Sequence, residues 1–286
     1  MEIRRAERKK AKLRLGIAAP SGAGKTYSAL LLAFGLGGKV GLIDTEHGSG
    51  DLYAHLGEYD VISIEAPYTT QKYVQAISAF EQAGYATVII DSLTHAWAGD
   101  GGLLDKQGKM ADRGTNSFAA WRTITPEHNA LVDAMLKSPC HIIATMRSKQ
   151  EYVLETNDKG KQQPKKVGMA PVQREGMEYE FTVMLDVDMN HIANASKDRT
   201  SLFDGQYFKI TSDTGVTLKQ WLENGTETPL VDFKVMLDAI ANAADIDLLK
   251  THYTSAIKLI GEQYHAQLTA AKDKRKLELT PIAKAA

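Results

Sequence analysis

The sequence has a single cysteine, Cys140, among its 286 residues. One cysteine excludes an internal disulfide, and a reducing cytoplasm is the compartment that we expect. Cys140 lies in the apolar run CHIIATM, which predicts a small buried side chain. The histidines are scattered and none stands at metal-ligand spacing from another, so a structural metal is not expected.

Long apolar runs and an excess of charge of one sign are also missing. No uninterrupted apolar segment is long enough to cross a bilayer, and the basic N-terminus has no apolar core of the signal-peptide type. We therefore expect a protein that is neither membrane-embedded nor exported. Because the formal net charge is −1, any affinity for nucleic acid must come from local clusters of lysine and arginine.

Short apolar strands alternate with helices along the first half of the chain. Strands that are apolar on both faces and separated by helices predict an α/β fold, with a mainly parallel central sheet and helices on both of its faces. The strands are predicted over residues 12–18, 39–44, 60–66, 85–91 and 140–147, and the helices over 25–38, 69–84 and 116–139.

The second half of the chain predicts additions to this core. A polar β-hairpin is expected at about 149–167, and antiparallel strands over 179–189, 191–199 and 205–218. A linker at 223–229 and many helix formers beyond it predict a small C-terminal helical appendage. The expected organisation is a basic arm at 1–11, a core at 12–222 with the hairpin inserted, and a helical region at 229–286.

The stretch APSGAGKT, residues 19–26, stands where a predicted strand gives way to a helix. A phosphate-binding loop (P-loop) has glycine, four residues and then Gly-Lys-Ser/Thr. Ala19 replaces the first glycine, but backbone N–H groups of the loop and the first helical turn make the cradle, so the chemistry is retained. The predicted ATP-binding residues are Pro20, Ser21, Gly22, Ala23, Gly24, Lys25, Thr26 and Tyr27.

Two carboxylates complete the predicted ATP site. Lys25 is expected to reach the β- and γ-phosphates, and Thr26 to ligate Mg²⁺ together with Asp91, which ends the apolar strand VIID. Ser92 follows Asp91, where many motor ATPases carry a glutamate, so the catalytic base has to lie elsewhere. Glu46, at the end of the strand after the P-loop helix, is the candidate base, and a solvated loop residue is the alternative.

These residues resemble the RecA-like recombinase ATPases. GLIDTEHGSGD is similar to the family's strand with the catalytic glutamate, and VIIDS is similar to its Walker-B strand, serine included. A closer resemblance is to small bacteriophage ATPases of the Sak-type single-strand annealing group and their AAA-labelled phage relatives. It rests on NSFAAWRTITPEHNALVDAM, CHIIATMRSKQEYVLE and KVGMAPVQREGMEYEF, and covers roughly residues 12–215.

The resemblance implies a RecA-like P-loop NTPase core that binds ATP and Mg²⁺ and assembles into a filament or ring with ATP at the junction of subunits. Arg147 matches a position that senses the γ-phosphate, where the family often has glutamine or asparagine. Lys197 and Arg199 match a basic pair that reaches the ATP of the neighbouring subunit. A solvated pair on one strand face is the alternative.

The resemblance also implies single-stranded DNA as a partner, bound by two loops. Clustered cations follow a phosphate backbone, and aromatic rings stack on unpaired bases. Acidic residues dilute the charge of the first loop, so the second is favoured, although a solubilising surface hairpin would have the same composition. The predicted contacts are Lys106, Lys109 and Arg113 at 98–117, and Lys149, Tyr152, Lys159, Lys161, Lys165 and Lys166 at 149–167.

The sequence therefore predicts a DNA-stimulated ATPase that binds single strands and anneals or exchanges them. Two alternatives remain open. One is a hexameric helicase or translocase motor on the same core, and the other is a nucleotide-gated module that binds proteins, such as a loader or regulator. The C-terminal helices are a candidate contact for a single-strand-binding protein or another recombination protein.

Overall fold

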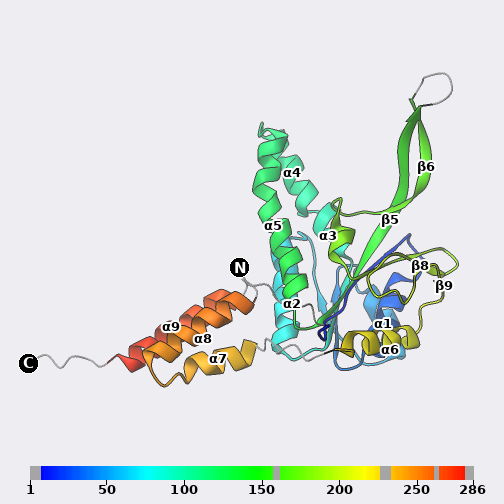
Figure 1. Cartoon of the computed structure of the whole chain (residues 1–286). Helices are drawn as coiled ribbons and strands as arrows, with labels where there is room; N and C mark the ends of the chain where they lie inside the picture. The colour runs from blue at the N-terminus through cyan, green and yellow to red at the C-terminus, as the bar shows by residue number, and fades with distance from the viewer. Residues whose placement is uncertain (1–7, 157–161, 226–232, 261–263, 281–286) are drawn as a thin grey trace, which may run out of the picture.

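The structure, a computed structural model, describes residues 8–156, 162–225, 233–260 and 264–280, and for 150–156 and 162–168 it describes the backbone alone. A central sheet with helices on both faces forms the body of the molecule (Figure 1). A helix pair and a β-hairpin project from one side of this body, and a C-terminal group of helices lies apart from it.

The sheet is mainly parallel, as the sequence predicts, and the pairs β5–β6, β7–β8 and β8–β9 are antiparallel. Because β5 lies between β1 and β4, the strand before the P-loop and the strand that ends in Asp91 are not neighbours. The strand order is β3 (Asp60–Ser63), β2 (Val40–Asp44), β4 (Thr87–Asp91), β5 (His141–Thr156), β1 (Arg14–Ala19), β7 (Val183–Val187), β8 (Ala193–Asp198) and β9 (Tyr207–Phe208), with β6 (Gln162–Pro171) paired to β5.

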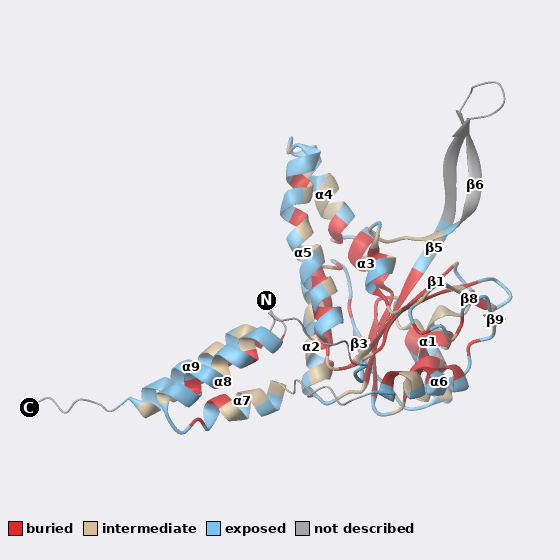
Figure 2. Ribbon diagram, viewed as in Figure 1, coloured by how far each residue is buried: buried red, intermediate tan, exposed pale blue. Residues whose placement is uncertain are grey.

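Helices cover both faces of the sheet because successive strand residues point to opposite faces. Leu15 and Ile17 of β1 pack in the apolar cluster under α1 and α6, whereas Ala18 belongs to the cluster under α2 and α5. Strands β1, β2 and β4 are buried throughout, which Figure 2 shows in red. The helices are α1 (Lys25–Leu36), α2 (Thr70–Gln82), α5 (Ser117–Lys137) and α6 (Ser212–Glu223), with 3₁₀ helices η1 (Ser49–Leu56) and η2 (Met177–Glu180).

Helices α1 and α6 pack closely because each has a glycine where they meet. A Cβ atom on Gly35 would lie 2.0 Å from the carbonyl oxygen of Ser212, and one on Gly215 would lie 2.3 Å from that of Leu32. No side chain fits at either position without moving a helix. This contact fixes α6 against the helix that begins at the P-loop.

The expectation of strands over 205–218 is wrong for most of that segment. Strand β9 has two residues, and the chain then enters α6. A capping box begins the helix: the Thr211 side chain caps the backbone of Thr214, and the Thr214 hydroxyl accepts from the Thr211 N–H at 3.2 Å. Helical spacing of the buried Leu218 and Leu222 then outweighs the strand preference of the β-branched residues.

Two projections leave the edge at which the parallel strands end. The first is the pair of α4 with the start of α5, and the second is the hairpin of β5 and β6 (Figure 1). The expectation of a loop over the whole of 98–117 is wrong, because the 10 residues of α4 occupy half of that segment. Trp97 and Trp121 stack with ring centres 5.6 Å apart and belong to the apolar cluster between α4 and α5. The bounds are α3 (Leu93–Ala98) and α4 (Leu103–Asp112).

The C-terminal helical region packs around an apolar cluster of its own, which includes Ile240, Leu249 and Leu268. It consists of α7 (Phe233–Ala241), α8 (Ile246–Leu259) and α9 (His265–Leu279). The predicted linker at 223–229 lies partly outside the described residues. In the part of the chain that the structure describes, no helix is long and apolar enough to cross a membrane.

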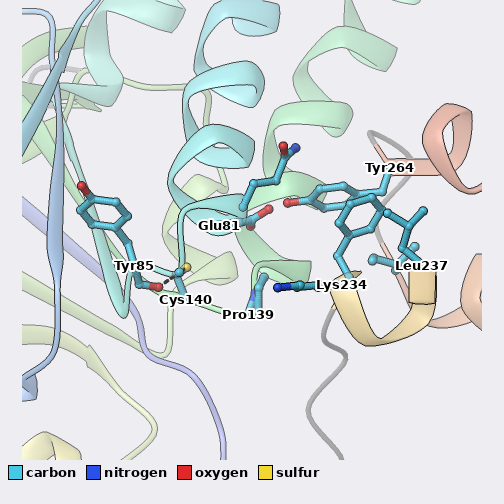
Figure 3. Close-up of a pocket in the computed structure, with 11 residues that line it drawn as sticks. Glu81, Tyr85, Pro139, Cys140, Lys234, Leu237 and Tyr264 are labelled. Atoms are coloured by element: carbon cyan, nitrogen blue, oxygen red, sulfur yellow. Dashed lines mark hydrogen bonds between the residues drawn. The ribbon is translucent and has the colours of Figure 1, made fainter. Parts of the chain in front are cut away.

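A cavity of about 480 Å³ lies between the core and the C-terminal helices (Figure 3). Glu81 of α2, Tyr85 and Tyr264 contribute to its walls. Cys140 is buried, as predicted, and its Sγ donates to the carbonyl oxygen of Tyr85 at 2.9 Å. Because Cys140 directly precedes β5, the cavity lies at the edge of the sheet opposite the P-loop and is separate from the nucleotide site.

Candidate nucleotide site

The P-loop connects β1 to α1. Gly22 and Gly24 have φ angles of 83° and 87°, the left-handed region that favours glycine. Gly24 is the N-cap of α1, so the free N–H groups of the first helical turn lie at the loop. Lys25 Nζ donates to the carbonyl oxygens of Ala19 at 3.3 Å and Pro20 at 3.1 Å. The loop therefore has the form that a phosphate cradle requires.

Asp91 meets the P-loop helix although β5 separates its strand from β1. Thr26 Oγ1, in the first turn of α1, donates to Asp91 Oδ2 at 2.5 Å, and the Thr145 hydroxyl of β5 donates to Oδ1. Burial raises the pKa of Asp91, and these two hydrogen bonds offset part of the shift. The hydroxyl and the carboxylate are hard oxygen donors at one point, which suits Mg²⁺.

Glu46 follows β2 and is held from several sides. Arg147 donates to both of its carboxylate oxygens, Nε to Oε1 at 3.1 Å and Nη2 to Oε2 at 2.5 Å. The Ser92 hydroxyl donates to Oε1 at 3.1 Å, and His95 Nε2 lies 4.0 Å from the same oxygen. Burial alone would raise the pKa of Glu46, but the hydrogen bond and charge of Arg147 outweigh it and lower the pKa. The carboxylate is therefore held ionised.

The structure brings the predicted residues of the ATP site within electrostatic range of each other. Burial lowers the pKa of Lys25, the negative charges of Asp91 and Glu46 offset part of that shift, and Arg147 adds to it. Arg147 also donates its backbone N–H to the Thr94 hydroxyl at 2.9 Å, which fixes the strand beside α3. A cluster of two cations and two carboxylates thus lies at the C-terminal edge of the sheet.

Sequence reasoning missed several polar residues around this cluster. Thr45 accepts the Ser92 N–H at 2.9 Å and lies 2.7 Å from His95 Nδ1, so it links the ends of β2 and β4. Thr145 could have been identified from the sequence, because it is the polar residue of an otherwise apolar predicted strand. His191, in the β7–β8 turn, has Nδ1 3.1 Å from the Ala23 carbonyl oxygen of the P-loop, and no pattern in the sequence pointed to that contact.

Lys197 and Arg199 lie away from their own P-loop. In the sheet register Lys197 is opposite Met184, which is opposite Gly16, near the start of β1. Lys197 Nζ donates to the carbonyl oxygens of Glu178 and Tyr179, at 3.1 and 2.5 Å, and Arg199 Nη2 donates to that of Tyr179 at 3.2 Å. The structure therefore does not bring this pair to the ATP site of the same chain.

The predicted DNA-binding residues differ in their ion pairing and exposure, and some lie outside the described residues. Lys106 pairs with Glu127 at 2.5 Å, and Lys109 pairs with Asp105 at 2.5 Å and with Asp100 at 3.6 Å, so their charges are matched within the chain. Arg113 and Lys149 are exposed. The side chains of Tyr152, Lys165 and Lys166, and the whole of Lys159 and Lys161, lie outside the described residues.

A P-loop at the start of one helix, a buried carboxylate at the end of β4 and a mainly parallel sheet define a P-loop NTPase. A family model described as an AAA domain matches residues 11–215. The chain belongs to this family of nucleotide-binding ATPases, and the matched span contains all of the predicted ATP site. A comparison with curated proteins finds no match.

Proposed function

We propose that the protein binds single-stranded DNA under the control of ATP and anneals or exchanges strands in phage recombination or replication. The proposal combines the ATPase class of the family with the sequence resemblance to Sak-type annealing proteins. Its second part, the DNA, rests on the two projections beside the ATP site.

The continuity of β5 carries the proposal. This strand holds Thr145, which contacts Asp91, then Arg147, which holds Glu46, and it runs on without a break to pair with β6. A rigid secondary element that touches two sites can couple them. A strand of DNA on the hairpin would therefore act on the groups around ATP.

The residues of the ATP site have separate tasks in this proposal. Lys25 and the loop N–H groups orient the phosphates, and Thr26 with Asp91 would hold Mg²⁺, which neutralises charge on the phosphate oxygens. Glu46 accepts the proton of the attacking water once Arg147 has released the Glu46 carboxylate. The ionised state of the carboxylate, kept by its lowered pKa, supports this role.

The position of Lys197 and Arg199 supports the proposal that the protein assembles into a homo-oligomer. Lys197 on β8 and Arg199 just after it do not lie at the P-loop of their own chain, and in this proposal they contact the γ-phosphate of a neighbouring subunit. The neighbour would have to displace the carbonyl groups that now bind them. Filament and ring both satisfy this geometry.

The test is anisotropy of a fluorescent single-stranded oligonucleotide, with ATP, with a non-hydrolysable analogue and without nucleotide. We expect binding that depends on nucleotide and phosphate release that DNA stimulates. Lys25→Ala is the matched variant, since it removes the P-loop lysine that we propose to contact the phosphates and leaves the residues of both projections unchanged.

No oligonucleotide binding at low salt in any nucleotide state would refute the proposal. Directional unwinding of a duplex would favour the motor instead. ATP-dependent association with a protein, together with indifference to DNA, would favour the protein-binding module.

A further inference from the structure

Phe118 has an unusual place on the surface. It is 88% exposed, more than any other large apolar residue in the part of the chain that the structure describes. It is the second residue of α5, at the outer end of the α4–α5 projection (Figure 1). Single exposed apolar side chains are common on protein surfaces, so only the charged residues near this one make it a candidate for contact with a partner.

Arg122 lies one turn further along the same face of α5. Residues four positions apart are neighbours on a helix surface, and both Phe118 and Arg122 are exposed. Trp121 points instead toward the inside of the projection, where it stacks on Trp97 of α3. The outer face of α5 therefore presents an aromatic ring and a guanidinium side by side, while its inner face is packed.

Two arginines lie at the outer end of the projection: Arg113, which the sequence already predicts as a DNA contact, and Arg122, which it does not. Lys106 and Lys109 are matched by carboxylates along the projection. For Arg113 and Arg122, the described residues supply no ion pair, and Asp112 is the exposed acid beside them. Residues 112–122 therefore have a formal net charge of +1, although residues 100–127 as a whole have a net charge of zero.

We propose that Phe118 stacks on a base of single-stranded DNA while Arg113 and Arg122 contact the adjoining phosphates. This inference rests on the proposed function. It assigns the DNA contact of the α4–α5 projection to these three residues instead of Lys106 and Lys109. A ring flanked by cations matches the alternation of bases and phosphates along a single strand. A second copy of the chain fits less well, because a stable interface needs about 800 Å² on each partner with an apolar centre, and this tip offers one ring among polar residues.

The experiment measures oligo(dT) affinity of the full-length chain for the wild type, Phe118→Ala, Phe118→Trp and Arg122→Gln. We expect Phe118→Ala to weaken binding about 5- to 100-fold, the loss of one stacked base, and Phe118→Trp to retain it with fluorescence quenching beyond that of the wild type. Arg122→Gln should lower the salt dependence of log K by about one ion. Tyr207→Ala, a ring 78% exposed at the far end of the sheet, is the matched control and should bind as the wild type does.

The outcomes separate the two proposals. If the wild type binds DNA and Phe118→Ala binds equally well, the stacking inference is overturned and the proposed function stands. If the wild type binds no DNA, both are overturned. If Phe118→Ala changes the oligomeric mass by light scattering and leaves the affinity of each subunit unchanged, the ring is a subunit contact and the inference is wrong.

Discussion

The guanidinium of Arg147 grips the carboxylate of Glu46 through two hydrogen bonds, of 3.1 and 2.5 Å. Bidentate pairs of this kind are strong and directional. The side chains are nevertheless 46% and 22% exposed, so water and phosphate can compete for either partner. The pair can therefore act as a switch for hydrolysis. Glu46 is ionised but paired with Arg147, and it becomes available as a base when Arg147 binds another anion instead.

Arg147→Gln should uncouple hydrolysis from DNA. Without the guanidinium, Glu46 keeps the Ser92 hydroxyl as a partner but lacks the bidentate pair in every state. We therefore expect phosphate release without DNA at least as fast as in the wild type, and no further stimulation by single strands. Steady-state phosphate release with and without oligonucleotide measures this. Arg147→Lys keeps the charge but not the bidentate geometry and should fall between the two. Undiminished stimulation in Arg147→Gln would contradict the switch.

Glu46→Gln should separate binding from chemistry. The amide keeps the size of the side chain but cannot accept a proton from water, so we expect hydrolysis to fall about 10²- to 10⁴-fold. Nucleotide affinity, measured by calorimetry, should stay within a few-fold of the wild type, because Lys25 and the loop make the phosphate contacts. Loss of affinity together with rate would show instead that Glu46 shapes the binding site.

Mixing two inactive variants should test where Lys197 and Arg199 act. Lys25→Ala lacks a phosphate contact, and Arg199→Ala lacks the cation offered to a neighbour, so each should be inactive alone. In an equal mixture about a quarter of the junctions combine an intact Lys25 with an intact Arg199, and activity should return in proportion. A mixture as inactive as its components would mean that Arg199 serves another purpose.

Gly35→Ala should destabilise the core. The added Cβ would lie 2.0 Å from the Ser212 carbonyl oxygen, so α6 has to move, and we expect a loss of about 1–3 kcal/mol or more in the free energy of unfolding. Gly108→Ala is the matched control: it also lies within a helix but meets nothing within 4 Å, and it should gain about 0.5–1 kcal/mol. Urea unfolding followed by circular dichroism compares them. Equal effects would show that the α1–α6 contact is not tight.

Glu81 should make stability depend on pH. Burial raises its pKa from 4.5 to about 7, with the Ser138 hydroxyl and the charge of Arg14 offsetting part of the shift. The unfolded chain therefore releases this proton at lower pH than the folded protein does. The free energy of unfolding falls as the pH rises from 4.5 to about 7. The loss amounts to about 3 kcal/mol and is complete above pH 7.

Glu81→Gln has no such proton, so its unfolding free energy relative to the wild type should increase across the same window. Denaturant unfolding at a series of pH values gives the difference. Asp133→Asn, an exposed carboxylate of α5, controls for a general change of charge. A difference between Glu81→Gln and the wild type that is independent of pH would refute the shift.

Local patterns were enough to predict the core and the nucleotide site in outline. The strand before Ala19, the helix after Gly24 and the strand ending in Asp91 follow from short-range periodicity and turn chemistry, and these are properties of neighbouring residues. Two segments were predicted wrongly because local composition pointed to a different structure from the one that packing favours. At 205–218 β-branched residues concealed a helix that a capping box begins, and at 98–117 glycines concealed α4, which packs on α5.

What the sequence by itself determined is the identity of the phosphate loop, because its geometry comes from consecutive backbone groups. The sequence also predicted that Thr26, Glu46, Asp91 and Arg147 belong to this site, but tertiary structure alone decided which of them contact one another. Glu46 and Arg147 are 101 positions apart, and Thr26 and Asp91 are 65 apart. Their contacts depend on strand order, on the insertion of β5 beside β4 and on the crossing of α1. These are consequences of how whole elements pack, which no local pattern contains.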